Sequence, residues 1–466
     1  MNYILFVIPL LYIVLSSLHK SIYTDTLSYT HKRIKIVNYF SNNKDQQFVL
    51  HKSDNHIYRN RTIQSKFDLS DFNQIILINL TDEYVHVEGL TRFDDLLDYT
   101  LAHGYMPQVV PELRSLTIGG VISGVGLESS SFKYGLFHDT AIEYEVITGN
   151  GDIVICNNTT NTDLYYGLPN SYGTLGYVLS AKIKIVKAKP YVKISNTHFT
   201  DPSVFIQAIE EYKHSPRAVD FVDGLILDKT NMYISEGVMV DNVNGNKISS
   251  YGIDIYYKSI PIKKQDYLTI KGYIWRYDSN YFYLGGDGNY LYENRILRTL
   301  AYPFLRSDIM RKLDANVVIN LFLDYATANT HVESIVNDLS IDTKIFTSFL
   351  EWFDNSMNVY PVWICPYRTI RDTFFLQKDM YEIDFGVGFG VTKEVHENDE
   401  PHKHKKIIDQ KMFEMKQKKG LYSTTYLSFE NFQSLYDEKQ TYNPLKSKYD
   451  TNKRFPTLYS KVCENV

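Results

Sequence analysis

Residues Thr117 to Gly126 read TIGGVISGVG, the part of the sequence richest in glycine. Gly119, Gly120, Gly124 and Gly126 stand within eight residues. Glycines let a backbone run close to a ligand, and the free N–H groups of such a segment can donate hydrogen bonds. The next residues, LESSS, add further donors. The pattern suits a cofactor that carries a pyrophosphate, and the alternative is a loop punctuated by glycine.

A second cluster, Asn170 to Gly176 (NSYGTLG), also combines glycines with hydroxyls and leads into an apolar strand pattern over 176–186. Two such clusters in one strand-rich region favour a nucleotide-type cofactor. A Rossmann fingerprint is not present, because Ser129 stands where the third glycine of GxGxxG belongs. The sequence also contains no GxxxxGK[ST] loop and no HExxH metal motif.

The residues around the two clusters alternate between strand and turn patterns. Ile75–Asn79 and Tyr84–Glu88 are expected to be strands joined by a polar turn. A helix is expected next, capped by Thr91 and ended by Gly104. Residues 142–156 have the hairpin signal of two strands around Gly-Asn-Gly. This order predicts an α+β domain.

The first domain is expected to end near Pro190, and the rest of the chain mixes strands and helices without a repeat. Helices are expected at 203–214 and 342–357. Residues 402–420 hold seven Lys against one Asp and one Glu, which predicts a solvated surface helix. Its apolar positions share one face: Ile408, Met412 and Met415.

Composition narrows the class of protein. The 466 residues carry 49 basic and 54 acidic side chains, a net charge of −5, so a nucleic-acid partner is not expected. Cys156, Cys365 and Cys463 form no CxxC pair, which excludes a disulfide framework and a cysteine zinc site. No metal is predicted. The length allows two or three domains.

The N-terminus reads as a membrane signal. Ile4 to Leu18 carry no charge and would span roughly 22 Å as a helix, with Lys and Arg following the run rather than preceding it. This arrangement favours a signal anchor at residues 1–22 over a cleaved signal peptide, with the body of the protein on the cytosolic side.

Several blocks together resemble one known family. They are VPEL (110–113), TIGG (117–120), GLESSS (126–131), KYGLF (133–137), GTLG (173–176), VYPVWICP (359–366) and FPTLY (455–459). These blocks are similar to the delta(24)-sterol reductase family, which includes the seladin-1 and DIMINUTO/DWARF1 proteins. The resemblance covers most of residues 30–466, is dense in 107–193 and is thin in 194–350.

The resemblance implies an α+β flavoprotein of the PCMH type, similar to vanillyl-alcohol oxidase. Its expected parts are a transmembrane anchor (1–22), an FAD-binding domain of two subdomains (23–190) and a cap or substrate domain with C-terminal helices (191–466). The FAD contacts that it implies come from both clusters: Thr117, Ile118, Gly119, Gly120, Gly124, Gly126, Glu128, Ser129, Ser171, Gly173, Thr174 and Gly176.

The activity that the resemblance implies is reduction of the sterol side-chain C24=C25 double bond with NADPH, at the endoplasmic reticulum membrane. An isolated alkene has no carbonyl to stabilise negative charge, so an acid must protonate one carbon as hydride reaches the other. The candidates are Tyr422, which is the first choice, Asp384 and Tyr367. A phenol suits an apolar tunnel better than a carboxylate does.

One stretch departs from the family pattern. A Gly/Pro turn usually meets the FAD pyrophosphate in the first subdomain, whereas residues 50–55 here read LHKSDN without glycine. His51 and His56 invite the idea of a histidyl-flavin bond, which the family does not use. Two alternatives therefore stay open: an FAD-linked oxidase of a small alcohol or lactone, and a non-enzymatic sterol-binding homologue without flavin.

Overall fold

The computed structural model describes residues 25–44, 46–51, 65–214, 219–278, 295–302, 305–309, 332–373, 380–387, 392–396 and 399–463. The expected anchor at 1–22 and Lys52–Asn55 of the glycine-free loop lie outside the described residues. Within the described ranges, no helix combines the length and apolar character needed to cross a bilayer.

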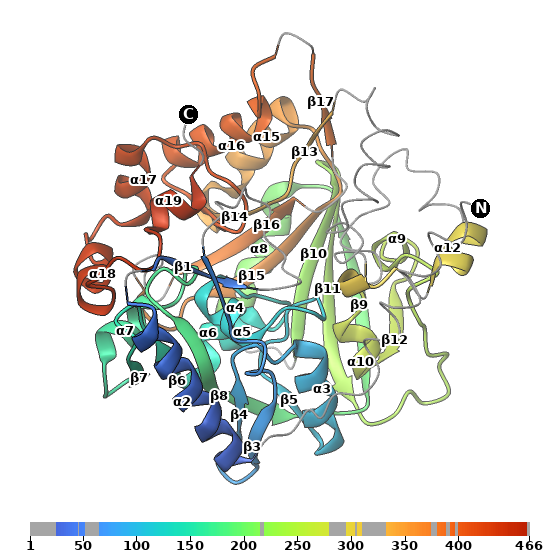
Figure 1. The fold of residues 1–466 in the computed structure, drawn as a ribbon. Coiled ribbons are helices and arrows are strands. Elements are labelled where there is room, and N and C mark those ends of the chain that lie inside the picture. Colours follow the sequence, from blue (N-terminus) through green and yellow to red (C-terminus); the bar gives the residue numbers. More distant parts are fainter. Residues whose placement is uncertain are drawn as a thin grey trace, which may run out of the picture.

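A six-stranded antiparallel sheet forms the first half of the molecule (Figure 1). Its order is β3-β4-β8-β6-β7, and β5 pairs with β8. The strands are β3 (Ile75–Asn79), β4 (Tyr84–Glu88), β5 (Tyr105–Pro107), β6 (Ala141–Ile147), β7 (Ile153–Asn157) and β8 (Tyr177–Lys187). The helices among them are α3 (Phe93–Ala102), α4 (Ile118–Ser123), α5 (Ser131–Tyr134), α6 (Phe137–Thr140) and α7 (Thr162–Gly167).

A smaller unit precedes this sheet in the chain. Helix α2 (Thr26–Asn42) is followed by β1 (Phe48–His51) and β2 (Ser65–Asp68), which pair in parallel. Asp25 caps α2 by accepting a hydrogen bond from Ser28 N at 2.7 Å. An aromatic core joins the unit to the sheet and to the C-terminus: Phe40, Phe48, Phe67, Tyr177 and Phe455.

The second half contains an eight-stranded sheet in the order β12-β9-β11-β10-β15-β16-β14-β18. Its strands are β9 (Tyr191–Phe199), β10 (Phe221–Asp228), β11 (Asn231–Val240), β12 (Gln265–Thr269), β14 (Asn337–Asp342), β15 (Val362–Arg368), β16 (Tyr381–Val387) and β18 (Lys418–Lys419). Elements beside it include α9 (Tyr256–Ser259), α10 (Ile270–Ile274), α12 (Arg295–Ala301), and the paired β13 (Val332–Ser334) and β17 (Thr392–Glu394).

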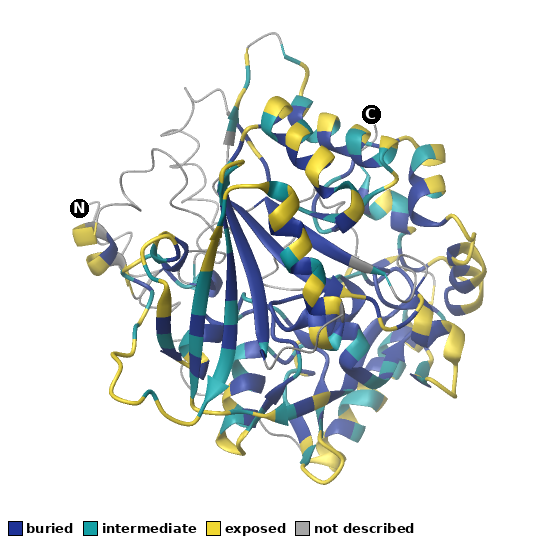
Figure 2. Ribbon diagram, turned by 180° about the vertical axis from the view of Figure 1, so that it is seen from behind, coloured by how far each residue is buried: buried dark blue, intermediate teal, exposed yellow. Residues whose placement is uncertain are grey.

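The two faces of this sheet pack against different layers because side chains alternate along each strand. Ile364 of β15 belongs to a core shared with α8 (Pro202–His214), α15 (Phe346–Ser356) and α16 (Lys403–Glu414). Figure 2 shows these helices with their exposed sides turned to solvent. The neighbouring β15 residues, Trp363, Cys365 and Tyr367, belong instead to the core of the first half. The inner face of the large sheet therefore meets the glycine-rich segment.

The C-terminal helices α17 (Phe429–Tyr436), α18 (Tyr442–Tyr449) and α19 (Leu458–Val462) return to the first half of the molecule. Lys448 forms an ion pair with Asp163 at 2.7 Å, and Phe48 N donates to Arg454 O. Figure 1 shows α18 beside α7. The end of the chain thus helps to hold the small N-terminal unit in place.

Most of the expected secondary structure is confirmed. The strands at 75–79 and 84–88, the hairpin within 142–156 and the helices near 203–214 and 342–357 are all present. The expected surface helix is α16, whose Ile408 and Met412 are buried. The prediction that Thr91 caps α3 is wrong: Arg92 holds the cap position, and the Thr91 hydroxyl donates to Gln74 O instead.

Candidate functional site

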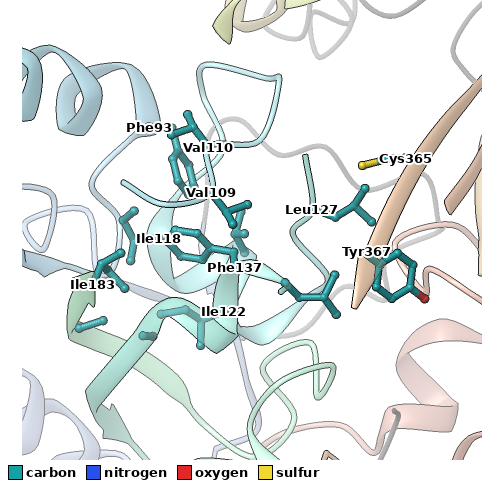
Figure 3. Close-up of a cluster of buried hydrophobic side chains, with 14 of the residues drawn as sticks. Phe93, Val109, Val110, Ile118, Ile122, Leu127, Phe137, Ile183, Cys365 and Tyr367 are labelled. Atoms are coloured by element: carbon teal, nitrogen blue, oxygen red, sulfur yellow. The ribbon is translucent and has the colours of Figure 1, made fainter. Parts of the chain in front are cut away.

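The glycine-rich segment lies between the two sheets, where α4 packs on β8 (Figure 1). Thr117 and Ile118 are buried, and Ile118 contributes to the core of the first half (Figure 3). A Cβ on Gly119 would come within 3.0 Å of Gly89 O and 3.1 Å of Val178 Cβ. Gly120, by contrast, is exposed while its neighbours on both sides are buried. The segment therefore offers accessible backbone at Gly120.

The other glycines of the two clusters have packing reasons of their own. A Cβ on Gly126 would lie 2.0 Å from Val121 Cγ1, and one on Gly176 would lie 2.4 Å from Val146 Cγ1. Gly173 has a positive φ of 76°, which other residues rarely adopt. Gly124 donates to Gly120 O at 2.9 Å and ends α4. The glycines thus allow close packing as well as any approach to a ligand.

Glu128 and Ser129 end the segment and connect it to the large sheet. Both are buried, and the Glu128 carboxylate accepts from Arg276 Nη2 at 2.9 Å. The same nitrogen donates to Asp223 Oδ2 of β10 at 2.9 Å. Ser129 O accepts from Val222 N at 2.7 Å. Arg276 is fully buried and is enclosed by tyrosine rings, with Tyr273 centred 4.1 Å from its guanidinium carbon.

The second cluster contains buried polar atoms without protein partners. Asn170 is fully buried, and neither its amide nitrogen nor its amide oxygen has a hydrogen-bond partner among the described residues. The buried Ser171 hydroxyl likewise has no hydrogen-bond partner among the described residues. Buried polar groups are normally paired, so such atoms indicate a partner other than the described residues. These two residues and the exposed backbone at Gly120 fit a polar cofactor.

Residues near the C-terminus form hydrogen bonds to the backbone and side chains of the second cluster. Lys446 Nζ donates to Thr174 O at 2.7 Å, and Tyr442 donates from its hydroxyl to Thr174 Oγ1 at 2.9 Å. Lys461 Nζ donates to Tyr172 O at 2.6 Å. The loop conformation therefore depends on residues almost 300 positions further along the chain.

Carboxyl groups gather on the inner face of the large sheet, opposite the glycine segment. Asp384 lies on β16 and Asp338 on the adjacent β14, with the register pairs Ser340–Asp384 and Asp338–Gly386. Burial raises the pKa of Asp384 well above its usual range, and the nearby carboxyls of Asp338 and Glu112 raise it further. Asp384 Oδ2 is buried without a hydrogen-bond partner among the described residues.

The pKa values of the other two carboxyls are raised as well. Glu112 and Asp338 are both half-buried. Burial raises the pKa of Asp338 to about 6, although a hydrogen bond from Tyr422 opposes the shift. Burial and the charge of Glu128 raise the pKa of Glu112 well above its usual range. These groups hold protons more firmly than free carboxyls do.

The three expected acids are brought to this one face of the sheet. Tyr422 follows β18 and is hydrogen-bonded to Asp338. Asp338 in turn is the diagonal neighbour of Asp384. Tyr367 of β15 donates to the Glu382 carboxylate and is also bonded to the Ser340 hydroxyl. Burial and the charge of Glu382 raise the pKa of Tyr367 well above its usual range. Figure 3 shows Cys365 and Tyr367 on the strand opposite Leu127.

The sequence analysis did not assign a role to Glu112, Asp338, Asp223 or Arg276, and it placed Asn170 in the second cluster without including it among the FAD contacts. Two of the first four had a readable signal. Asp338 stands in NDLSID, where polar and apolar residues alternate, and Glu112 stands in the block VPEL. The polar face of such a strand is normally assigned to solvent. Here that face meets the first domain.

The sequence is similar to known proteins along most of its length. Residues 34–157 match the family described as FAD binding domain. The rat delta(24)-sterol reductase is 28% identical over 414 residues, covering 84% of this chain and 77% of the rat protein. The human delta(24)-sterol reductase is 27% identical over 414 residues, covering 84% of this chain and 77% of the human protein. Cytokinin dehydrogenase 1 of Arabidopsis thaliana is 27% identical over 177 residues, covering 37% of this chain and 31% of that protein.

Proposed function

We propose that this chain, an FAD-dependent oxidoreductase homologous to the delta(24)-sterol reductases, reduces the side-chain C24=C25 double bond of a sterol with NADPH as the electron source. One observation carries the proposal. Carboxyls with raised pKa values and a phenol lie on the inner face of the large sheet, which faces the glycine segment of the first half. Reduction of an isolated alkene needs such an acid, whereas oxidation of an alcohol needs a base.

The proposed FAD site uses both glycine clusters. Gly120 would offer backbone to the cofactor, and Asn170 and Ser171 would supply the unpaired polar atoms. Glu128 and Ser129 would act indirectly, since both are bonded to the large sheet and Arg276. FAD, when bound, supplies the hydride and so both electrons.

The protein then supplies the proton. The inner face of the large sheet would bind the sterol side chain, and its apolar residues Trp363 and Cys365 would exclude water from the reacting carbons. The Tyr422 hydroxyl would donate its proton to one alkene carbon as the other receives hydride. Addition of one hydride and one proton gives the neutral, saturated side chain. Asp384 and Tyr367 lie nearby as the other candidates.

The decisive experiment uses purified full-length protein in detergent. A yellow preparation with flavin absorbance bands supports the cofactor, and a colourless one overturns it. The protein is then incubated with NADPH and a sterol that has a C24=C25 double bond. Mass spectrometry should find a product two hydrogen atoms heavier. Oxygen consumption with a small alcohol, and no sterol product, would instead identify an oxidase.

Gly120→Val tests the position of the cofactor. The valine side chain would project from an exposed position, so we expect the protein to fold and to lose its flavin. Flavin content per folded chain is measured by absorbance, with circular dichroism as the control for folding. Gly119→Val is the contrasting variant: its side chain would meet Gly89 O and Val178, so it should destabilise the fold itself. Full flavin content in folded Gly120→Val would place the cofactor elsewhere.

The proposed domain organisation is an anchor at 1–22, an FAD-binding domain at 23–190 and a cap domain at 191–466, with the protein at the endoplasmic reticulum membrane and its body in the cytosol. We expect that deleting residues 1–22 releases the protein from membranes without loss of flavin, because the described residues form their own cores. Alkaline carbonate extraction of both forms measures this. Full-length protein that washes off would contradict the anchor.

A further inference from the structure

We propose that Glu112, Asp384 and Asp338 form a shared-proton relay that returns a proton to Tyr422 after each reduction. The relay rests on the proposed sterol reduction. It assigns a function to Glu112 and Asp338, two carboxyls on opposite sides of the interface between the sheets.

The strand register places two of the three carboxyls close together. Asp338 and Asp384 occupy diagonal positions on the same face of adjacent antiparallel strands. Diagonal neighbours in a sheet are about 7–8 Å apart at the backbone, so their side chains can approach one another or share one water molecule. The Tyr422 hydroxyl is bonded to Asp338, at the end of this row. Glu112 approaches from the loop before α4 and raises the pKa of Asp384 by its charge.

The balance of charge requires protons in this region. Five carboxyls meet near the interface: Glu112, Glu128, Asp223, Asp338 and Asp384. Within the described part of the chain, Arg276 is the cation that contacts two of them, Glu128 and Asp223, and the remaining three have no ion pair there. An unpaired buried carboxylate is expensive, so such groups keep a proton instead. The buried, unpaired Asp384 Oδ2 is the atom best suited to carry it.

The proton moves in a balanced sequence. Tyr422 gives its proton to the substrate carbon and is left as a phenolate. The Asp338 carboxyl passes a proton to the Tyr422 oxygen and takes one from Asp384. Asp384, now a carboxylate, is reprotonated from water through the partly accessible Glu112. One proton leaves and one enters in each turnover, and no electron passes through these residues.

The pH dependence follows from the raised pKa values. A carboxyl with a raised pKa keeps its proton to a higher pH, so the relay is loaded at low pH and is lost as pH rises. Burial raises the pKa of Asp338 to about 6, so this carboxyl loses its proton as the pH rises through that value. Other titratable groups face the same space and can shift the profile: Cys365, Tyr367, Glu382, Lys418, Glu128, Asp223 and Arg276.

Infrared spectroscopy of the full-length holoprotein tests the relay directly. A protonated carboxyl has a C=O stretching band that is separate from the carboxylate bands. We expect wild-type protein to retain this band at pH 7 and Asp384→Asn to lose it in part. Glu382→Gln is the matched control, because Glu382 is a buried carboxyl on the same strand and face that is bonded to Tyr367. This control should leave the band unchanged.

Turnover gives the second readout. In Asp384→Asn we expect sterol turnover to fall roughly 10-fold, and more steeply as pH rises, while reduction of flavin by NADPH is unchanged. Absence of the wild-type band at pH 7, or an unchanged pH profile in the variant, overturns the relay. The presence or absence of the infrared band in the wild-type protein tests the relay even if the variant does not fold. If the wild-type protein shows the infrared band and flavin but gives no sterol product, the proposed sterol reduction is wrong. Because the band is present in that case, this result differs from a failure of the relay, in which the band is absent.

Discussion

Tyr422→Phe is expected to lower sterol turnover by about 10²-fold or more, the range for loss of a general acid, while NADPH still reduces the flavin at a near-normal rate. The substitution removes only the hydroxyl that is bonded to Asp338 and keeps the packing of the ring. Hydride transfer to an isolated alkene without a simultaneous proton would leave an unstabilised carbanion. The two half-reactions should therefore separate cleanly in this variant.

Stopped-flow absorbance measures flavin reduction by NADPH and flavin reoxidation by sterol in separate experiments. Tyr426→Phe is the control, since Tyr426 lies four residues further along and its ring stacks on His402, 5.1 Å away between centroids. Loss of both half-reactions in Tyr422→Phe would mean that Tyr422 shapes the site. Undiminished turnover would remove Tyr422 as the acid and leave Asp384 and Tyr367.

Arg276→Met is expected to reduce the free energy of unfolding by about 3–5 kcal/mol, the usual effect of removing one partner of a buried ion pair. Arg276 is fully buried and contacts both Glu128 and Asp223, which also accepts from Trp363 Nε1 at 3.1 Å. Without the guanidinium, two carboxylates would remain buried between the glycine segment and the large sheet. Methionine fills a similar volume, so the lost charge dominates the effect.

Urea unfolding of wild type and variant measures this difference. Lys271→Met is the matched control: it lies five residues away, and its ion pair with Asp98 is half exposed on both sides, so little change is expected. Adding Glu128→Gln to Arg276→Met should recover part of the stability, because it removes one unpaired charge. A change below about 1 kcal/mol in Arg276→Met would show that the carboxyls accept protons without difficulty.

Local sequence patterns predicted the secondary structure well where the residues have a strong preference for one backbone conformation. The hairpin at 142–156 and the strands of β3 and β4 depend on alternation and on turn residues, which neighbours in the chain determine. Thr91 failed as a cap because its hydroxyl bonds to Gln74 O, 17 residues earlier, and that competition is tertiary. The packing of α18 beside α7 likewise follows from contacts between distant segments, such as Lys448 with Asp163.

The glycine-rich segment, the α+β character and the resemblance that pointed to FAD could all be predicted from the sequence, because each depends on short runs of neighbouring residues. Which carboxyls face one another became known from the tertiary structure alone. Asp338 and Asp384 are 46 positions apart and become neighbours through the β14–β16 register, while Glu112 comes from the other half of the molecule. Electrostatic coupling depends on distance in space and on the exclusion of water, and neither can be inferred from the neighbouring residues in the chain.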